Sequence, residues 1–252
     1  MPNWCDNAGY IKVTDRTTER GREIFKKLAE HGTEANWFST VMPVPAEMHL
    51  GLGCTQGNRE YMSLEWLRAN SKFEGDFGEF TKDDENTRGE FKPSPEYTVY
   101  LKRTFGATDW YHWCVKNWGT KWDVELNANH VFDSSPDKLE FSFASAWGPP
   151  VEFFTWLSNE ELDWSLDYIE PGNCFAGAAL YVDGEAAHIE HTDEDVILFG
   201  IDRFDMEIEF FTPVENYDSF DAYTADHKHG ERVTEFVLGY YAARVEHAAQ
   251  RP

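Results

Sequence analysis

Four tryptophans fall within fourteen residues in the run Trp110-Tyr111-His112-Trp113-Cys114-Val115-Lys116-Asn117-Trp118-Gly119-Thr120-Lys121-Trp122-Asp123. The apolar residues up to position 118 recur at i, i+3, i+4 and i+8, which is the spacing of one face of an α-helix. Thr108 is a candidate N-cap, and Gly119 stands where a left-handed residue commonly ends a helix. The run therefore predicts a helix that ends abruptly and passes into a strand near Lys121.

These tryptophans allow two interpretations. The first places them in the core of a small α/β domain, because indole rings bury a large apolar area. The second concerns Trp118 and Trp122, which flank the Gly-Thr-Lys turn that ends at Lys121. Aromatic side chains around a turn are typical of recognition surfaces, so these three residues are candidate ligand-binding residues.

Length and composition allow one large domain or two small ones. The chain has 252 residues, of which 41% are hydrophobic and 16% aromatic, so it can build a core and is not expected to be disordered. No apolar run approaches the roughly 20 residues that span a bilayer. The N-terminus lacks the basic start and apolar core of a secretory signal. The cysteines are scattered without metal-ligand spacing, which predicts a cytoplasmic protein with free thiols: Cys5, Cys54, Cys114 and Cys174.

The formal charge of -24 is spread unevenly along the chain. Residues 1–158 contain 24 acidic and 17 basic residues, whereas residues 159–252 contain 22 acidic and 5 basic residues. A field of this sign repels nucleic acid and anionic membranes and attracts basic surfaces. The acidity indicates either simple solubility or a face that docks on a basic partner, such as the groove of a nucleic-acid-binding protein.

The candidate partner-binding residues lie in the acidic segment 190–221. Residues two apart in a strand share a face, so Glu207 and Glu209 would lie side by side, as would Asp193 and Asp195. Like charges aligned in this way repel one another, and folding alone does not favour them. We therefore expect a docking face that contains Asp193, Glu194, Asp195, Glu207 and Glu209.

Periodicity and turn signals predict an α+β fold. Helices are expected at 18–31, 59–69, 110–118, 150–159 and 230–248, and strands at 8–14, 35–41, 97–102, 122–132, 137–147, 164–170, 174–182, 186–191, 196–201 and 206–211. Asp183-Gly184 is a strong hairpin signal. This order favours largely antiparallel sheets. We expect an N-terminal α/β region at 1–148 with a polar insertion at about 46–105, followed by an acidic C-terminal region at 149–252.

Catalytic and metal-binding signatures are weak. The glycine-rich residues 51–57 follow residues 46–50, which lack the strand pattern that a phosphate-binding loop requires. His188 and His191 have acidic neighbours but not the spacing of a known metal motif. Cys114 lies on the apolar stripe of its helix, which indicates a core thiol. The sequence therefore predicts no metal and no cofactor, and it favours a protein without enzymatic activity.

Glu170 also allows two interpretations. It ends a predicted strand directly before Pro171-Gly172. A carboxylate there can cap the backbone N–H groups of the turn, which is the interpretation that we favour. It can equally point into a cleft lined by Trp147, and in that case both residues are candidate ligand-binding residues.

Five separated motifs follow one another along residues 1–190: Met1-Pro2-Asn3-Trp4-Cys5-Asp6-Asn7, Met42-Pro43-Val44-Pro45, Trp118-Gly119-Thr120-Lys121-Trp122-Asp123, Phe143-Ala144-Ser145-Ala146-Trp147-Gly148-Pro149-Pro150 and Tyr168-Ile169-Glu170-Pro171-Gly172-Asn173-Cys174-Phe175-Ala176-Gly177. Together they resemble an uncharacterised family carried by bacteriophages, prophages and conjugative plasmids. That family is described as having a ferredoxin-like domain in an Api-type protein. The resemblance implies a ferredoxin-like α/β sandwich and an accessory gene of a mobile element, and it implies no activity.

Two functional hypotheses follow. The first is a non-enzymatic binder in the host cytoplasm that inhibits a basic host protein, such as a defence nuclease, because spaced carboxylates resemble the phosphates of nucleic acid. The second is a small-ligand or nucleotide-binding protein, or an enzyme, that uses an aromatic-lined domain, because tryptophans stack well on bases. A partner lost at high salt would favour the first hypothesis, and a bound metabolite that survives salt would favour the second.

Overall fold

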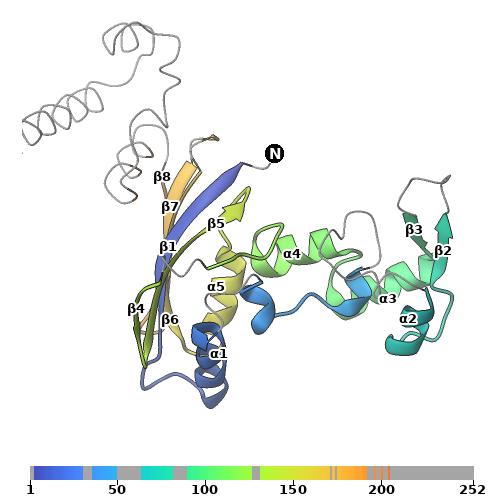
Figure 1. Ribbon diagram of the computed structural model, residues 1–252, viewed down its shortest axis with the longest axis horizontal. Helices are drawn as coiled ribbons and strands as arrows, with labels where there is room; N and C mark the ends of the chain where they lie inside the picture. The colour runs from blue at the N-terminus through green and yellow to red at the C-terminus, as the bar shows by residue number, and fades with distance from the viewer. Residues whose placement is uncertain are drawn as a thin grey trace, which may run out of the picture.

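The computed structural model describes residues 3–30, 36–49, 64–81, 90–126, 131–170, 172–173 and 175–191, with the single residues 196, 200 and 204. Six strands form the main sheet, namely β1 (Trp4–Lys12), β4 (Val131–Ser135), β5 (Lys138–Ala146), β6 (Asp163–Glu170), β7 (Phe175–Val182) and β8 (Glu185–His191). They lie in the order β4-β5-β1-β6-β7-β8, and every neighbouring pair is antiparallel. Figure 1 shows this sheet with helices against one of its faces.

The connections give the sandwich a ferredoxin-like topology. Helix α1 (Glu19–Glu30) follows β1, and helix α5 (Val151–Ser158) joins β5 to β6. The chain order is thus β1-α1-β4-β5-α5-β6, with β1 between β5 and β6 in the sheet. This is the split βαβ pattern that the ferredoxin-like fold repeats twice. The predicted fold class, α+β with largely antiparallel sheets, is confirmed, and the β7–β8 hairpin widens the sheet.

Successive side chains of each strand point to opposite faces of the sheet, and one of these faces is buried against the helices. In β1, Cys5, Asn7 and Ile11 point toward the helices and are buried, while Trp4 is exposed on the opposite face. The helices contribute apolar stripes to the same core, as amphipathic helices do. This core contains Ile24, Phe25 and Leu28 of α1, Phe153, Phe154 and Leu157 of α5, and Leu139, Phe141 and Phe143 of β5.

A long segment between α1 and β4 forms an arm that extends away from the sheet (Figure 1). It contains two 3-10 turns, η1 (Phe38–Thr40) and η2 (Ala46–His49), and a small antiparallel pair, β2 (Gly78–Thr81) and β3 (Glu90–Pro93). Its helices are α2 (Leu64–Asn70), α3 (Pro95–Phe105) and α4 (Trp110–Trp118). Clustered rings give the far part of the arm its own apolar centre: Phe73, Phe77, Phe91, Tyr97 and Tyr100.

Helix α4 confirms the helix predicted from the tryptophan run, although its N-cap differs. The Asp109 carboxylate, and not Thr108, accepts the cap hydrogen bond from the backbone N–H of His112 at 2.9 Å. Gly119 ends the helix with φ +84°, the left-handed conformation that glycine adopts without strain. Trp113 and Cys114 are buried as predicted.

Three of the strands predicted between α1 and β4 differ from the structure in their described parts. Residues 97–102 lie in α3, because Ser94 caps this helix, Pro95 suits its first turn and Gly106 ends it. The segment 35–41 contains η1 in its described part. Residues 122–126 contain only an isolated bridge, and the next strand begins at Val131. Alternation of apolar residues over a few positions is thus a weaker signal than the cap, proline and glycine that bound α3.

The hairpin prediction is confirmed at Asp183-Gly184. Both residues have positive φ, 55° and 84°, as the two-residue turn between antiparallel strands requires. Val196 and Gly200 are helical and not extended, and Val196 packs with Ile169 on the face of the sheet away from α1 and α5. The strand predicted at 206–211, the helix predicted at 230–248, Cys54 and Cys174 lie outside the described residues.

The predicted division at residue 148 falls between β5 and α5, which both belong to the sandwich. It stays a prediction, as does the polar insertion at about 46–105, where the structure describes η2, α2, β2, β3 and α3.

Among the described residues, no helix has the length and apolar character needed to cross a membrane.

Candidate functional site

Aromatic rings, two of them exposed and two partly buried, gather near one lysine at the end of the sheet where β1 begins and β5 finishes. Trp4 opens β1, Trp147 follows β5, and Tyr111 and Trp122 come from α4 and the loop after it. Trp4 lies 6.1 Å from Trp122, and Tyr111 lies 6.0 Å from Trp147, between ring centroids. We call these four rings with Lys121 the aromatic end.

Lys121 lies at the centre of this group. Its Nζ atom is 4.5 Å from the centroid of the Trp147 ring, 4.6 Å from that of Trp122 and 6.0 Å from that of Tyr111. These distances fall within the range in which a ring quadrupole attracts a cation. The side chains thus form a cage of rings around an ammonium group.

The backbone around the cage is fixed by hydrogen bonds to the sheet. The Thr120 hydroxyl donates to the carbonyl of Ala146 at 2.8 Å, which ties the loop carrying Lys121 to the end of β5. The backbone N–H of Trp147 donates to the carbonyl of Asn3 at 2.9 Å. The two halves of the cage therefore share the same strand ends.

Asp123 anchors the loop from its other side. Its carboxylate accepts hydrogen bonds from the backbone N–H groups of Phe38, Ser39 and Val124, at 2.7 to 2.9 Å. Burial raises the pKa of the Asp123 carboxyl above its usual range, and these N–H donors act in the opposite direction. The loop is thus held to both η1 and β5, so Lys121 and Trp122 have a defined position.

Trp147 adopts an unusual backbone conformation for its size. Its φ is +71°, in the left-handed region that a residue with a Cβ enters at a cost of about 1–2 kcal/mol. The residue is nevertheless 43% exposed, so the strain is not held at an enclosed core position. Strain held at an exposed aromatic residue is an observation from which a functional role is reasonably inferred.

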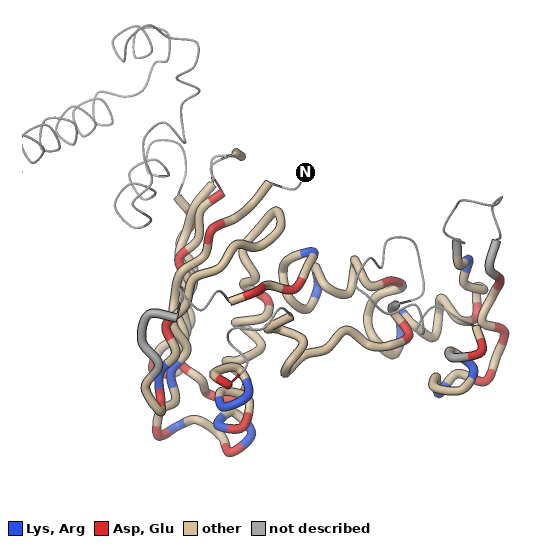
Figure 2. Tube along the Cα trace, in the orientation of Figure 1, with Lys and Arg blue, Asp and Glu red and all other residues tan. Residues whose placement is uncertain are grey.

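The strand ends around the cage carry acidic residues. Asp6, Asp167, Glu170 and Glu190 lie in this half of the strands, and no lysine or arginine does. Figure 2 shows the same ends in red and tan, whereas lysine and arginine gather around α1 and the opposite end of the sheet. Burial raises the pKa of the Asp6 carboxyl, which favours its neutral form. The described strand ends around the cage are therefore acidic in composition and carry no lysine or arginine.

Of the five predicted ligand-binding residues, Lys121, Trp122 and Trp147 come together in the cage. Trp118 does not, because it is 2% exposed and its Nε1 donates to the carbonyl of Met42 at 3.2 Å inside the core. Glu170 does not either. Its buried carboxylate accepts from the backbone N–H groups of Gly172 and Asn173, so the turn-capping interpretation holds.

Sequence reasoning missed Trp4 and Tyr111. Trp4 could have been found by extending the predicted strand backward, since Trp4, Asp6 and Ala8 alternate with the buried Cys5 and Asn7. The five predicted partner-binding residues, Asp193, Glu194, Asp195, Glu207 and Glu209, lie outside the described residues.

Residues 121–213 match the family model described as the ferredoxin-like domain in Api92-like protein. The matched segment begins at Lys121 and includes β4 to β8 and α5. It therefore contains Lys121, Trp122 and Trp147, while Trp4 and Tyr111 lie before it. The chain is also similar to a crystal structure of protein api92 from Yersinia pseudotuberculosis, with 12% identity, a TM-score of 0.37, and 77% of this chain and 99% of that chain covered. No curated protein matches the chain.

The thiol nearest to the aromatic end is buried. Cys5 is fully enclosed, and burial followed by the charges of Asp6 and Glu170 raises the pKa of its thiol, so it remains protonated and a poor nucleophile. Its neighbour Asn7 donates to the Ser145 hydroxyl at 2.8 Å, which ties β1 to β5.

Within the described part of the chain, no three His, Cys, Asp or Glu side chains are arranged to hold a metal ion.

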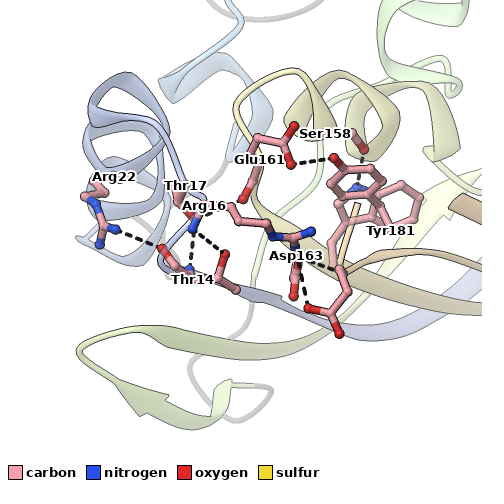
Figure 3. A network of polar contacts seen from close by, with 10 residues as sticks. Thr14, Arg16, Thr17, Arg22, Ser158, Glu161, Asp163 and Tyr181 are labelled. Carbon is pink, nitrogen blue, oxygen red and sulfur yellow. Dashed lines mark hydrogen bonds and ion pairs between the residues drawn. The ribbon is translucent and has the colours of Figure 1, made fainter. Parts of the chain in front are cut away.

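The opposite end of the sheet contains a polar network that Figure 3 shows from close by. Arg16, in the loop after β1, contacts the Asp163 carboxylate at 2.5 Å. Tyr181 donates to Glu161 at 2.6 Å, and the Thr17 hydroxyl donates to the Glu161 carbonyl at 2.9 Å. These groups satisfy one another and join the start of α1 to the α5–β6 turn, so we assign this end a structural role.

Proposed function

We propose that this chain is a non-enzymatic binding protein that engages and inhibits a basic protein of its host. It would act in the host cytoplasm as the product of a mobile genetic element, such as a phage or plasmid. The observation that carries the proposal is the aromatic end, where the exposed rings of Trp4 and Trp147 stand at acidic strand ends. Exposed tryptophans of this kind dominate the binding energy of many protein interfaces.

The acidic third of the chain supports a basic partner. Residues 159–252 contain 22 acidic and 5 basic residues, which exceeds what an even solvated surface would need. A field of this strength accelerates the approach of a positively charged protein and repels nucleic acid. We propose that Asp193, Glu194, Asp195, Glu207 and Glu209 guide the partner and that the aromatic end then binds it.

Charge reversal tests this proposal. A variant with Asp193, Glu194, Asp195, Glu207 and Glu209 changed to lysine should capture less of its partner from host lysate, and the loss should lie mostly in the association rate. Capture by the wild-type chain should fall steeply as salt rises, because exposed charges are screened. The partner is identified by mass spectrometry after crosslinking, and its binding rates are then measured with the purified pair.

A matched control reverses five exposed acidic residues elsewhere, on α1 and the arm: Glu19, Glu23, Glu65, Glu74 and Glu79. Both variants change the net charge by the same amount. If both variants inhibit and bind the partner as well as the wild type does, the acidity serves solubility and the docking proposal fails. If both lose binding equally, net charge and not a defined face guides association.

The arrangement around Lys121 also favours a second candidate function, the binding of a small ligand or nucleotide. Rings beside an ammonium group could stack on a base and neutralise a phosphate at once. Native mass spectrometry distinguishes the two functions. A small molecule that remains bound after a high-salt wash would favour this candidate, whereas a protein partner released by the wash would favour the first.

A further inference from the structure

The cage at the aromatic end has the construction of a site for a cationic side chain, and it is filled by the chain's own lysine. We infer that the rings of Trp122, Trp147 and Tyr111 form a receptor for an arginine or lysine side chain of the partner, which takes the place of Lys121. This inference rests on the proposed function only for the basic nature of the partner.

Geometry is the first argument. The Lys121 ammonium lies 4.5 and 4.6 Å from two ring centroids that belong to different parts of the chain, one after α4 and one after β5. A cation between two indole rings is the arrangement by which aromatic cages recognise ammonium and guanidinium groups. The cage therefore already accommodates a ligand of this class.

Backbone strain is the second argument. Trp147 holds its ring beside Lys121 through a φ of +71°, although the residue is 43% exposed. Its backbone N–H donates to the Asn3 carbonyl, which fixes the strained residue at the start of β1. One wall of the cage is thus set before any partner arrives.

Exchange is the third argument. Lys121 reaches the cage on a flexible four-carbon stem, so its ammonium can move into solvent when another cation enters. The charge inside the cage then stays the same.

Fluorine NMR tests the inference without the natural partner. The full chain is labelled with 5-fluorotryptophan, and the signals of Trp122 and Trp147 among the ten tryptophans are assigned with Trp122→Phe and Trp147→Phe variants. Four probes are titrated: the capped tripeptide Gly-Arg-Gly, its uncharged citrulline analogue, the capped tripeptide Gly-Lys-Gly, which compares ammonium with guanidinium, and adenosine monophosphate.

We expect the arginine peptide to shift the Trp122 and Trp147 signals and the citrulline peptide to leave them in place. Lys121→Ala should bind the arginine peptide several-fold more tightly, because the competing cation is gone. Trp147→Phe should weaken binding in the wild-type background, which keeps the inference testable if Lys121→Ala does not fold.

Lys138→Ala is the matched control, since Lys138 lies 5.2 Å from the Tyr10 ring at the other end of the sheet. It should leave arginine binding unchanged. Equal shifts from arginine and citrulline, or no gain of affinity in a folded Lys121→Ala, would overturn the inference. Stronger shifts from adenosine monophosphate than from the arginine peptide would also overturn it and favour base stacking. None of these results depends on the charge-reversal test of the acidic third.

Discussion

The two ends of the main sheet carry different kinds of side chain: paired polar groups at one end and aromatic rings at the other. At the end near Lys12, Arg16 and Asp163 pair, and Glu161 binds both Tyr181 and Thr17 (Figure 3). At the other end, the exposed Trp4 and Trp147 and the partly buried Tyr111 and Trp122 lie close to Lys121. Polar groups that satisfy one another stabilise a fold and leave little for a ligand. Trp147 combines exposure with a strained backbone, so we assign stability to the first end and binding to the second.

The largest effect on stability is expected from a substitution in the core beside the aromatic end. Trp113→Ala should lower the free energy of unfolding by about 3–5 kcal/mol, because Trp113 is buried and packs against Trp118. Urea denaturation followed by circular dichroism measures the change. Trp122→Ala serves as the comparison and should cost much less, since that ring is only partly buried. Equal losses in the two variants would contradict the division between core and surface tryptophans.

The next effect concerns the polar end. Asp163→Ala should destabilise the fold by about 2 kcal/mol, because it removes a nearly buried carboxylate that accepts from Arg16 and from the backbone of Asp183. Asp183→Asn is the matched control, since asparagine removes the charge and keeps the positive φ of the turn. The Asp183 side chain is 91% exposed and lies 3.9 Å from Arg16, so loss of its charge should not change the urea midpoint measurably. A large effect of Asp183→Asn would mean that long-range charge, and not the buried contact, stabilises this end.

A smaller effect is expected at Trp147. Trp147→Gly should change the free energy of unfolding by no more than about 1–2 kcal/mol, because relief of the positive φ offsets part of the burial that is lost with a residue 43% exposed. The same variant should lose binding of the basic partner, measured by capture from host lysate. Destabilisation comparable to that of Trp113→Ala would show that the ring serves the fold, and the comparison between the two ends would fail.

The smallest effect appears only at alkaline pH. Burial, aided by the nearby Glu190, raises the pKa of Tyr168 to about 12, and its hydroxyl lies 2.7 Å from Nε2 of His188. The folded state then holds this proton more tightly than the unfolded state, so the stabilisation is complete below about pH 10 and is lost as pH rises toward 12. The free energy of unfolding, measured in urea at a series of alkaline pH values, should fall less steeply with pH for Tyr168→Phe than for the wild type. Parallel curves would show that Tyr168 does not contribute to this loss.

Local sequence signals predicted the sandwich well. The α1 stripe, the alternation in β5 and the Asp183-Gly184 turn each depend on residues close together in the chain, so their periodicity is visible without the fold. The arm was predicted less well. Residues 97–102 alternate like a strand, but a serine cap and a following proline make them helical.

Prediction of the candidate site from the sequence was limited in a similar way. Lys121 and Trp122 were predicted from the turn that they share, and Trp147 from a cleft expected beside Glu170. That these three meet, that Trp4 and Tyr111 join them, and that Trp118 turns into the core depend on how β1, β5 and α4 come together. No signal within a single segment specifies which of several tryptophans will be exposed.

The fold class, the buried stripe of α4, the hairpin after β7 and the uneven charge can be predicted without the structure, because each follows from composition or from spacing within one element. The roles of three other residues became clear from the fold: Glu170 caps a turn, Trp118 is enclosed, and Lys121 lies between the rings of Trp122 and Trp147. Those outcomes depend on contacts between segments far apart in the chain, where the antiparallel register of β1 with β5 brings Trp4 opposite Ala146, directly beside Trp147.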